Sequence, residues 1–332
     1  MDSISVLGAG SWGTAIAQLL AEKGFETRLW ARSYELIDAI AASKENTVYL
    51  PGIKLSKNIL PHKDIEDALK GVSLVIFAIP SHGLRAIAEK ARELIPKGAV
   101  LVSATKGIEE ETLLTPSRIL EDALKGAPYK AVAALSGPTF AKEVSAGLPA
   151  AAVISSKNAE AAEYAQKAFS TPRFRVYTNA DVIGVELGGA LKNVIAIACG
   201  ISDGLQLGSN ARAALITRGL AEIARLGIKL GADAKTFSGL SGLGDLVLTC
   251  TGPLSRNYTL GTSLAAGRTL DEATKGMRMV AEGVKTSRAA VQLSEKHGSE
   301  LPVAKAVHSI LYESRQPREV VLELMTRGLK AE

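Results

Sequence analysis

A glycine-rich turn near the start of the chain restricts the possible folds more than any other feature of the sequence. Gly8, Gly10 and Gly13 spell GxGxxG directly after a short apolar segment at residues 4–7. Residues 12–20 then place apolar side chains at helical spacing. A strand, a glycine turn and a helix in this order are typical of a dinucleotide-binding α/β unit.

Each glycine of this turn has its own expected role. Gly8 permits the tight turn, Gly10 lets backbone N–H groups approach a pyrophosphate, and Gly13 allows the helix to pack closely on the strand. The N-terminus of the helix adds partial positive charge where the diphosphate would lie. We therefore predict that the turn binds a dinucleotide. A strand–turn–helix that uses its glycines only for packing is the alternative.

The end of the second predicted strand, residues 27–31, indicates which dinucleotide is bound. An NAD-specific site carries Asp or Glu here, about 20 residues after the glycines, to hold the ribose 2′-hydroxyl. This chain has Arg32 instead, which can bond a 2′-phosphate. We predict NADP(H) as the preferred cofactor and NAD(H) as a second one. A solvated surface arginine is the alternative interpretation.

Strand-like and helical segments alternate through the first half of the chain and then give way to helices alone. The later strand-like segments are residues 74–79, 100–103, 131–135, 151–155 and 174–177. This alternation predicts a doubly wound, mostly parallel sheet of the Rossmann type. A length of 332 residues suits two domains. We place the NAD(P)-binding Rossmann-type domain at 1–183 and an all-α, substrate-binding and catalytic domain at 184–332.

Composition excludes several other classes of protein. Hydrophobic residues make up 47% and charged residues 22% of the chain, as in soluble globular proteins. The net charge of +5 comes without a run of five like charges and with only 5% aromatic residues, so we expect small anionic ligands and no nucleic acid. The four histidines lack metal-ligand spacing, and we expect no metal site.

Cysteine usage and apolar runs suggest where the protein works. Cys199 and Cys250 are too few for a disulfide framework, which indicates a reducing compartment. The best apolar run, residues 72–79, is too short to cross a membrane, and the N-terminus lacks a signal-peptide pattern. We expect a cytoplasmic protein without membrane insertion.

A lysine within an apolar helix is the strongest candidate for chemistry. Lys192 lies in the predicted helix 185–202, where nearly every position is apolar or small. Its side chain should lean over Gly188 and Gly189, which would leave a gap for a small molecule beneath the ammonium. The composition of the helix is equally compatible with an alternative, in which Lys192 extends to solvent and the glycines allow close helix packing. The dinucleotide-binding half favours the catalytic interpretation.

Two further polar positions occur where ligands commonly bind. Lys106 follows the predicted strand 100–103, at the sheet edge where open α/β sheets bind ligands. Ser255, Arg256 and Asn257 stand at a helix entrance and are suited to holding a phosphate. Ser255 capping its helix beside an exposed arginine is an equally good explanation.

Seven segments of the sequence, taken together, resemble the bacterial NAD(P)-dependent glycerol-3-phosphate dehydrogenases. They are GAGSWGTA (8–15), ATKG (104–107), LSGPTFAKEV (135–144), the helix with Glu186, Lys192 and Asn193, SGLGDLVLTC (241–250), SRN (255–257) and VAEGV (280–284). The resemblance implies reversible reduction of dihydroxyacetone phosphate, a phosphorylated triose, to sn-glycerol 3-phosphate. That product would supply the backbone of phospholipids.

The resemblance also implies two sets of site residues. With the glycines of the turn, the cofactor set is Gly8, Gly10, Ser11, Trp12, Gly13, Arg32, Tyr49, Lys106, Ala141, Arg256, Val280 and Glu282. The substrate set is Lys106, Gly137, Thr139, Lys192, Asp245, Ser255, Arg256 and Asn257. Lys192 would be the proton donor and acceptor. Thr139 stands where the family commonly has serine, and Tyr49 stands where phenylalanine is common.

Two other functions are compatible with the same pattern. Dehydrogenases of the β-hydroxyacid and 6-phosphogluconate types also join a GxGxxG half to a helical half that carries a lysine. A nonenzymatic NADP(H) sensor is the alternative from another class, although a sensor has no evident use for a buried ammonium. We expect a homodimer, the commonest symmetric assembly.

Overall fold

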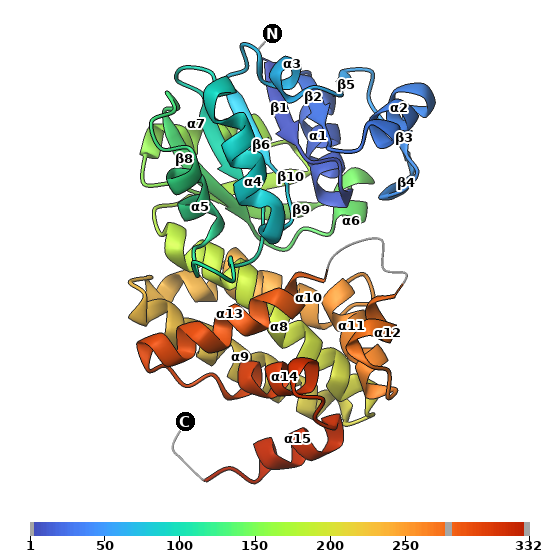
Figure 1. The fold of residues 1–332 in the computed structure, drawn as a ribbon, viewed down its shortest axis with the longest axis vertical. Coiled ribbons are helices and arrows are strands. Elements are labelled where there is room, and N and C mark those ends of the chain that lie inside the picture. Colours follow the sequence, from blue (N-terminus) through green and yellow to red (C-terminus); the bar gives the residue numbers. More distant parts are fainter. Residues whose placement is uncertain (1–2, 276–280, 329–332) are drawn as a thin grey trace. The chain divides into compact units, whose positions relative to one another are not determined.

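One sheet of eight strands organises the first part of the chain (Figure 1). The computed structural model describes residues 3–275 and 281–328, which group into two units. Unit 1 comprises residues 1–106 and 114–186, and unit 2 comprises residues 107–113 and 187–332. Unit 1 ends and unit 2 continues within helix α8 (Val182–Gly204). The expected domain boundary between residues 183 and 184 stays a prediction.

The sheet of unit 1 is doubly wound and mostly parallel, as predicted. Only β8 and β9 pair antiparallel within it. The strands lie in the order β10 (Phe174–Asn179), β9 (Ala150–Ser155), β8 (Ala131–Ser136), β7 (Val100–Ser103), β6 (Leu74–Phe77), β1 (Ser3–Leu7), β2 (Glu26–Trp30) and β5 (Ile59–His62). A separate antiparallel pair is formed by β3 (Glu45–Asn46) and β4 (Leu50–Lys54).

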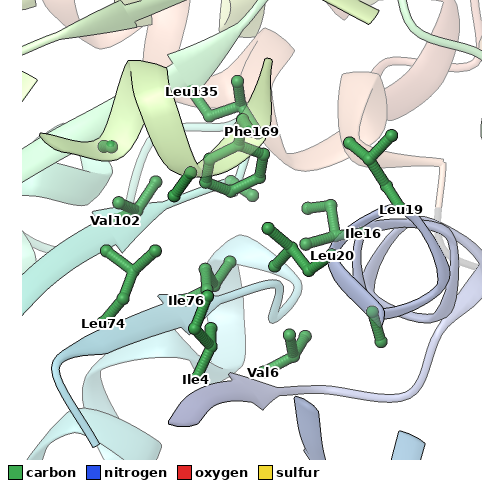
Figure 2. Packing of buried hydrophobic residues seen from close by; sticks show 14 of the residues in the cluster. Ile4, Val6, Ile16, Leu19, Leu20, Leu74, Ile76, Val102, Leu135 and Phe169 are labelled. Atoms are coloured by element: carbon green, nitrogen blue, oxygen red, sulfur yellow. The ribbon is translucent and has the colours of Figure 1, made fainter. Parts of the chain in front are cut away.

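Successive residues of the central strands point to opposite faces of the sheet and build a core on each. Val6, Ile76 and Val102 belong to the core that Figure 2 shows. Their neighbours Leu7 and Phe77 belong to the core on the other face. The first core is covered by α1 (Ser11–Glu22), α2 (Tyr34–Ser43), α6 (Ala141–Ser145) and α7 (Ala159–Phe169), and the second by α3 (Ile65–Leu69), α4 (Ser81–Ala91) and α5 (Pro116–Ala123).

The regular secondary structure of unit 2 is entirely helical among its described residues, which confirms the predicted change of pattern. Besides α8, its α-helices are α9 (Gly208–Lys229), α10 (Asp245–Cys250), α11 (Arg256–Ala265), α12 (Leu270–Thr274), α13 (Glu282–His297), α14 (Pro302–Tyr312) and α15 (Pro317–Met325). A 3₁₀ turn, η2 (Ala234–Ser238), and a π turn, η3 (Leu240–Gly244), precede α10.

Helix α8 is long and apolar enough to cross a membrane by length and composition, but its environment is that of a core helix. In its most apolar 18-residue window, 94% of the residues are buried inside the protein. A Cβ at Gly200 would lie 2.0 Å from the carbonyl oxygen of Tyr258, so this glycine lets α11 pack directly against α8. The helix therefore forms the centre of unit 2.

Two buried glutamates cap helices that begin with proline. The first N–H groups of a helix have no partner within it. Glu186 accepts hydrogen bonds from the backbone N–H and the hydroxyl of Ser117, in α5, at 2.7 and 2.6 Å. Glu222, in α9, accepts from the backbone N–H groups of Val303 and Ala304, in α14, at 2.8 and 3.3 Å. Burial nevertheless raises the pKa of both carboxyl groups.

We expect Glu222→Gln to weaken the pH dependence of stability. Burial raises the pKa of Glu222 from 4.5 to about 7, so the folded state binds its proton more tightly than the unfolded state. The stability that this proton contributes is complete below pH 4.5 and is lost as pH rises to about 7. The loss amounts to at most about 3 kcal/mol, because one pKa unit equals 1.36 kcal/mol. Urea unfolding between pH 4.5 and 8 measures it.

The matched control is Glu295→Gln, which changes an exposed carboxylate of the same unit. The control should follow the wild-type pH profile, whereas Glu222→Gln should lose less stability than the wild type over this range. Identical slopes for Glu222→Gln and the wild type would contradict the assignment.

Candidate active site

The glycine turn between β1 and α1 has the shape that a dinucleotide requires. Gly8 has a φ of +116°, and a Cβ there would lie 2.4 Å from the carbonyl oxygen of Ala78. A Cβ at Gly13 would lie 1.8 Å from the carbonyl oxygen of Gly8. A Cβ at Gly10 would meet nothing within 4 Å, so this glycine faces open space. The first and third glycines thus serve packing, and the second leaves room for a ligand.

A segment around β3 is fastened beside this turn by Asn46. The buried amide of Asn46 donates to the carbonyl oxygen of Ala9 at 2.9 Å and to the Thr14 hydroxyl at 2.8 Å, and its oxygen accepts from the backbone N–H of Tyr49 at 3.1 Å. The Ser11 hydroxyl donates to the carbonyl oxygen of Tyr49. Two predicted cofactor residues therefore come together here. The sequence pattern gave no signal for Asn46, a single polar residue in a turn-rich stretch.

Trp12 supplies a second observation that fits a bound cofactor. Its indole Nε1 is buried and has no hydrogen-bond partner among the described residues. Buried N–H donors are nearly always paired, so an unpaired one beside a ligand turn is a candidate contact for a ligand acceptor. The residues of the turn thus fit a dinucleotide both in shape and in donor chemistry.

Lys106 follows β7 at the carboxyl edge of the sheet and meets two other predicted site residues. Its Nζ donates to the carbonyl oxygen of Gly137 at 2.9 Å and lies 3.5 Å from the Thr139 hydroxyl. Gly137 has a φ of +134°, and a Cβ there would lie 2.9 Å from the Cα of Ala152. Ala141 begins α6 shortly afterwards. Unit 1 therefore gathers an ammonium, a carbonyl and a hydroxyl around one position.

In unit 2, Lys192 is buried with its ammonium held by two groups of α10. Only 6% of the residue is exposed, and its Nζ donates to Asp245 Oδ1 at 2.5 Å and to the Thr249 hydroxyl at 2.7 Å. The Thr249 hydroxyl in turn donates to the carbonyl oxygen of Asp245 at 2.6 Å. A lysine that extends to bulk solvent is therefore ruled out. Asp245 and Thr249 share one helix face because they are four residues apart.

The prediction of a gap beneath Lys192 is wrong at Gly188. A Cβ at Gly188 would lie 2.6 Å from the carbonyl oxygen of Ser241, so the backbone of η3 occupies that ground. The glycine serves close packing of η3 on α8, which was the alternative interpretation. Thr249 was not among the predicted residues. Its signal was available, since it follows Asp245 by one helical turn.

The starts of α11 and α13 are joined through a pair of asparagines. The Asn257 amide donates to Asn193 Oδ1 at 2.9 Å, and Asn257 Oδ1 accepts from the backbone N–H of Gly283 at 2.9 Å. Ser255 caps α11, because its hydroxyl accepts from the backbone N–H of Tyr258 at 3.3 Å. Asn257 is thus buried and anchors both helix starts.

Arg256 lies at the surface of this region and begins α11. Partial burial of the guanidinium lowers its pKa, and the Glu282 carboxylate at the start of α13 opposes that shift. Six predicted residues of unit 2 therefore fall into two clusters: Lys192 with Asp245, and, at the helix starts, Ser255, Arg256, Asn257 and Glu282. Val280, also predicted, lies outside the described residues.

Other kinds of reactive centre find little support in the structure. Among residues 3–275 and 281–328, no three His, Cys, Asp or Glu side chains gather as a metal ion would require. Cys199 and Cys250 are buried free thiols. A hydrogen bond with Cys199 and, to a smaller extent, burial raise the pKa of the Cys250 thiol well above its ordinary value. The Cys250 thiol is therefore a poor nucleophile.

Comparison with known proteins identifies the family. The model of the N-terminal part of NAD-dependent glycerol-3-phosphate dehydrogenase matches residues 3–162, and the model of its C-terminal part matches residues 181–322. A glycerol-3-phosphate dehydrogenase [NAD(P)+] of Citrifermentans bemidjiense is 52% identical over 331 residues, which cover 100% of this chain and 99% of that protein. One of Geobacter sulfurreducens is 49% identical with the same coverage.

Solved structures agree with the sequence comparison. The crystal structure of glycerol-3-phosphate dehydrogenase from Coxiella burnetii matches with a TM-score of 0.94 and 40% identity, over 98% of this chain and 99% of that one. The yeast enzyme matches with a TM-score of 0.82 and 28% identity, over 98% and 99%. The chain therefore belongs to the family of NAD(P)-dependent glycerol-3-phosphate dehydrogenases.

Proposed function

We propose that this dehydrogenase reduces dihydroxyacetone phosphate to sn-glycerol 3-phosphate, reversibly, with NADPH preferred over NADH. The observation that carries the proposal is the buried ammonium of Lys192, held by Asp245 and Thr249. Residues 1–183 bind the nucleotide, and residues 184–332 provide the substrate-binding and catalytic groups. The enzyme works in the cytoplasm as a homodimer, and its product supplies phospholipid synthesis.

Most of the residues proposed to bind the cofactor belong to unit 1. The N–H groups at the start of α1 would hold the diphosphate, and Gly10 leaves room for it. Trp12 Nε1, a buried donor without a hydrogen-bond partner among the described residues, would donate to the same cofactor. Ser11, Arg32, Tyr49, Lys106, Ala141, Arg256, Val280 and Glu282 complete its contacts. When bound, the nicotinamide supplies a hydride to the C2 carbonyl carbon of the substrate.

Lys192 is the proton donor in the reduction and the acceptor in the reverse direction. As an ammonium it protonates the C2 oxygen, which gains negative charge during the reaction. The Asp245 carboxylate and the Thr249 hydroxyl fix the position of Nζ, so little side-chain freedom is lost in the transition state. Lys106, with Gly137 and Thr139 beside it, holds the substrate.

Arg256 holds the phosphate of the substrate, with Ser255 and Asn257 next to it. A guanidinium can form two parallel hydrogen bonds to a phosphate. The start of α11 adds backbone N–H groups to the same position. Binding energy from this remote group positions the reacting carbon.

The test is NADPH oxidation, followed by absorbance, with dihydroxyacetone phosphate and with 2-oxo and 3-oxo carboxylates. We expect fast, saturable oxidation with the triose phosphate and little with the carboxylates. Preference for a carboxylate would identify a dehydrogenase of the β-hydroxyacid type. NADPH binding without oxidation under any of these conditions would identify a sensor.

The cofactor preference predicts the effect of Arg32→Ala. A hydrogen bond to a charged partner contributes about 1.5–3 kcal/mol, so loss of the guanidinium should weaken NADPH binding by roughly 10- to 100-fold. NADH binding should change little, since NADH has no 2′-phosphate. Calorimetric titration with both cofactors measures the difference. Equal weakening of both would show that Arg32 does not bind the 2′-phosphate.

A further inference from the structure

A cavity of about 220 Å³ lies in unit 1 at the carboxyl end of β2. Such a volume is far above the roughly 10–15 Å³ that one water molecule needs. Its lining combines cationic and aromatic side chains with one carboxylate: Trp30, Arg32, Tyr34, Glu35, Lys63 and Lys90. We name it the Trp30 cavity. Neither Lys63 nor Lys90 was predicted from the sequence as a site residue.

The Trp30 cavity adjoins the glycine turn. β1 and β2 are parallel neighbours, and Leu7 pairs with Trp30. The backbone N–H of Gly8 donates to the carbonyl oxygen of Trp30 at 2.8 Å. The turn and the cavity therefore occupy adjacent positions on one edge of the sheet, where a dinucleotide extends from its diphosphate to its adenosine end.

Trp30 itself positions both lysines. Its indole Nε1 donates to the carbonyl oxygen of Lys63 at 2.9 Å, and β5 pairs with β2 so that His62 stands beside Trp30. Lys63 follows β5 directly and lines the same cavity as Arg32. The ammonium of Lys90, on α4, lies 5.7 Å from the centre of the Trp30 ring, within the range of a cation–π interaction.

The charges of the cavity favour an anion. Three cationic side chains face one carboxylate, Glu35, whose pKa is lowered by hydrogen bonds with its own backbone and with Ser33. Asp38, which is not part of the lining, forms an ion pair with Lys63 at 2.8 Å. Its carboxylate offsets part of the positive charge of Lys63. Lys90 and Arg32 supply the remaining positive charge. A phosphate monoester carries the charge and the acceptor oxygens that such a cavity can satisfy.

We propose that Lys63 and Lys90, with Arg32, form the binding site for the 2′-phosphate of NADP(H) and set the preference for NADPH over NADH. The proposal rests on the proposed function, since it assumes that the adenosine end of the cofactor enters the Trp30 cavity. The Glu35 carboxylate repels the 2′-phosphate and therefore weakens the preference for NADPH. The lysines contribute to cofactor selection and take no part in hydride or proton transfer.

The test compares Kd values for NADPH and NADH, measured by calorimetry on the full chain. Partly exposed charge pairs contribute a few tenths to about 1 kcal/mol, so Lys90→Gln and Lys63→Gln should each weaken NADPH binding roughly two- to fivefold. The double variant should show roughly the product of the two effects. In every variant, the fold-change in Kd for NADH should be less than about half of the fold-change in Kd for NADPH.

Glu35→Gln provides a test of opposite sign, because it removes the only carboxylate of the lining. It should tighten NADPH binding roughly twofold relative to NADH binding, and glutamine keeps an oxygen for the Ser33 hydroxyl. Lys97→Gln, at an exposed lysine outside the cavity, is the matched control and should change neither Kd.

Equal effects of Lys90→Gln on NADPH and NADH would overturn the proposal, as would an unchanged NADPH-to-NADH ratio in both Lys90→Gln and Glu35→Gln. These measurements are independent of turnover. Failure of the wild type to oxidise NADPH with dihydroxyacetone phosphate would contradict the proposed function instead, whatever the binding ratios are.

Discussion

Lys192→Ala is expected to lower kcat for dihydroxyacetone phosphate by roughly 10²- to 10⁴-fold, the usual contribution of a general acid. The variant lacks the group that protonates the C2 oxygen, while the glycine turn of unit 1 is untouched. NADPH should therefore bind with a nearly unchanged Kd. Steady-state kinetics and calorimetric titration measure the two quantities on the same preparation.

The control for this prediction is folding, because Lys192→Ala leaves Asp245 buried without its cation. Removing one partner of a buried ion pair costs about 3–5 kcal/mol. Lys192→Met combined with Asp245→Asn removes both charges and keeps the volume nearly constant, so it should recover stability in urea unfolding without recovering kcat. Near-normal turnover in either variant would refute Lys192 as the proton donor.

Arg256→Ala is expected to raise KM for dihydroxyacetone phosphate roughly 10- to 100-fold. Arg256 lies at the surface at the start of α11, and a charged hydrogen bond to phosphate is worth about 1.5–3 kcal/mol. An unphosphorylated analogue, dihydroxyacetone, cannot make that bond. Its kcat/KM should therefore fall much less in the same variant.

Arg268→Ala, at an exposed arginine of unit 2 outside the predicted site, serves as the control and should leave KM unchanged. If Arg256→Ala lowered kcat/KM equally for dihydroxyacetone and its phosphate, Arg256 would not contact the phosphate.

Much of the fold is encoded locally and could be predicted. The central strands read as apolar runs because both of their faces are covered, as with Val75, Ile76 and Phe77. The helices of the second half show helical spacing and glycine or proline boundaries. β5 was not predicted, since Pro61 and His62 interrupt its apolar pattern and its pairing with β2 is a long-range contact.

The site could be predicted only where one residue type has a distinctive context. The glycines of the turn and Lys192 in its apolar helix stand out in the sequence. Asn46 acts through hydrogen bonds to residues distant in sequence, and a single asparagine carries no pattern of its own. Thr249 could have been found only from its spacing to Asp245, since its bond to Lys192 is also long-range. The function of Gly188 was misjudged for the same reason, because the backbone that fills its space belongs to η3.

The most direct test of the account is a crystal structure of the enzyme with NADPH and sn-glycerol 3-phosphate, which together cannot react. We predict that Lys192 Nζ lies within hydrogen-bond distance of the C2 oxygen, about 2.6–3.2 Å, while it keeps its contact with Asp245. A C2 oxygen that instead contacts other side chains, with Lys192 directed away from it, would contradict the central claim.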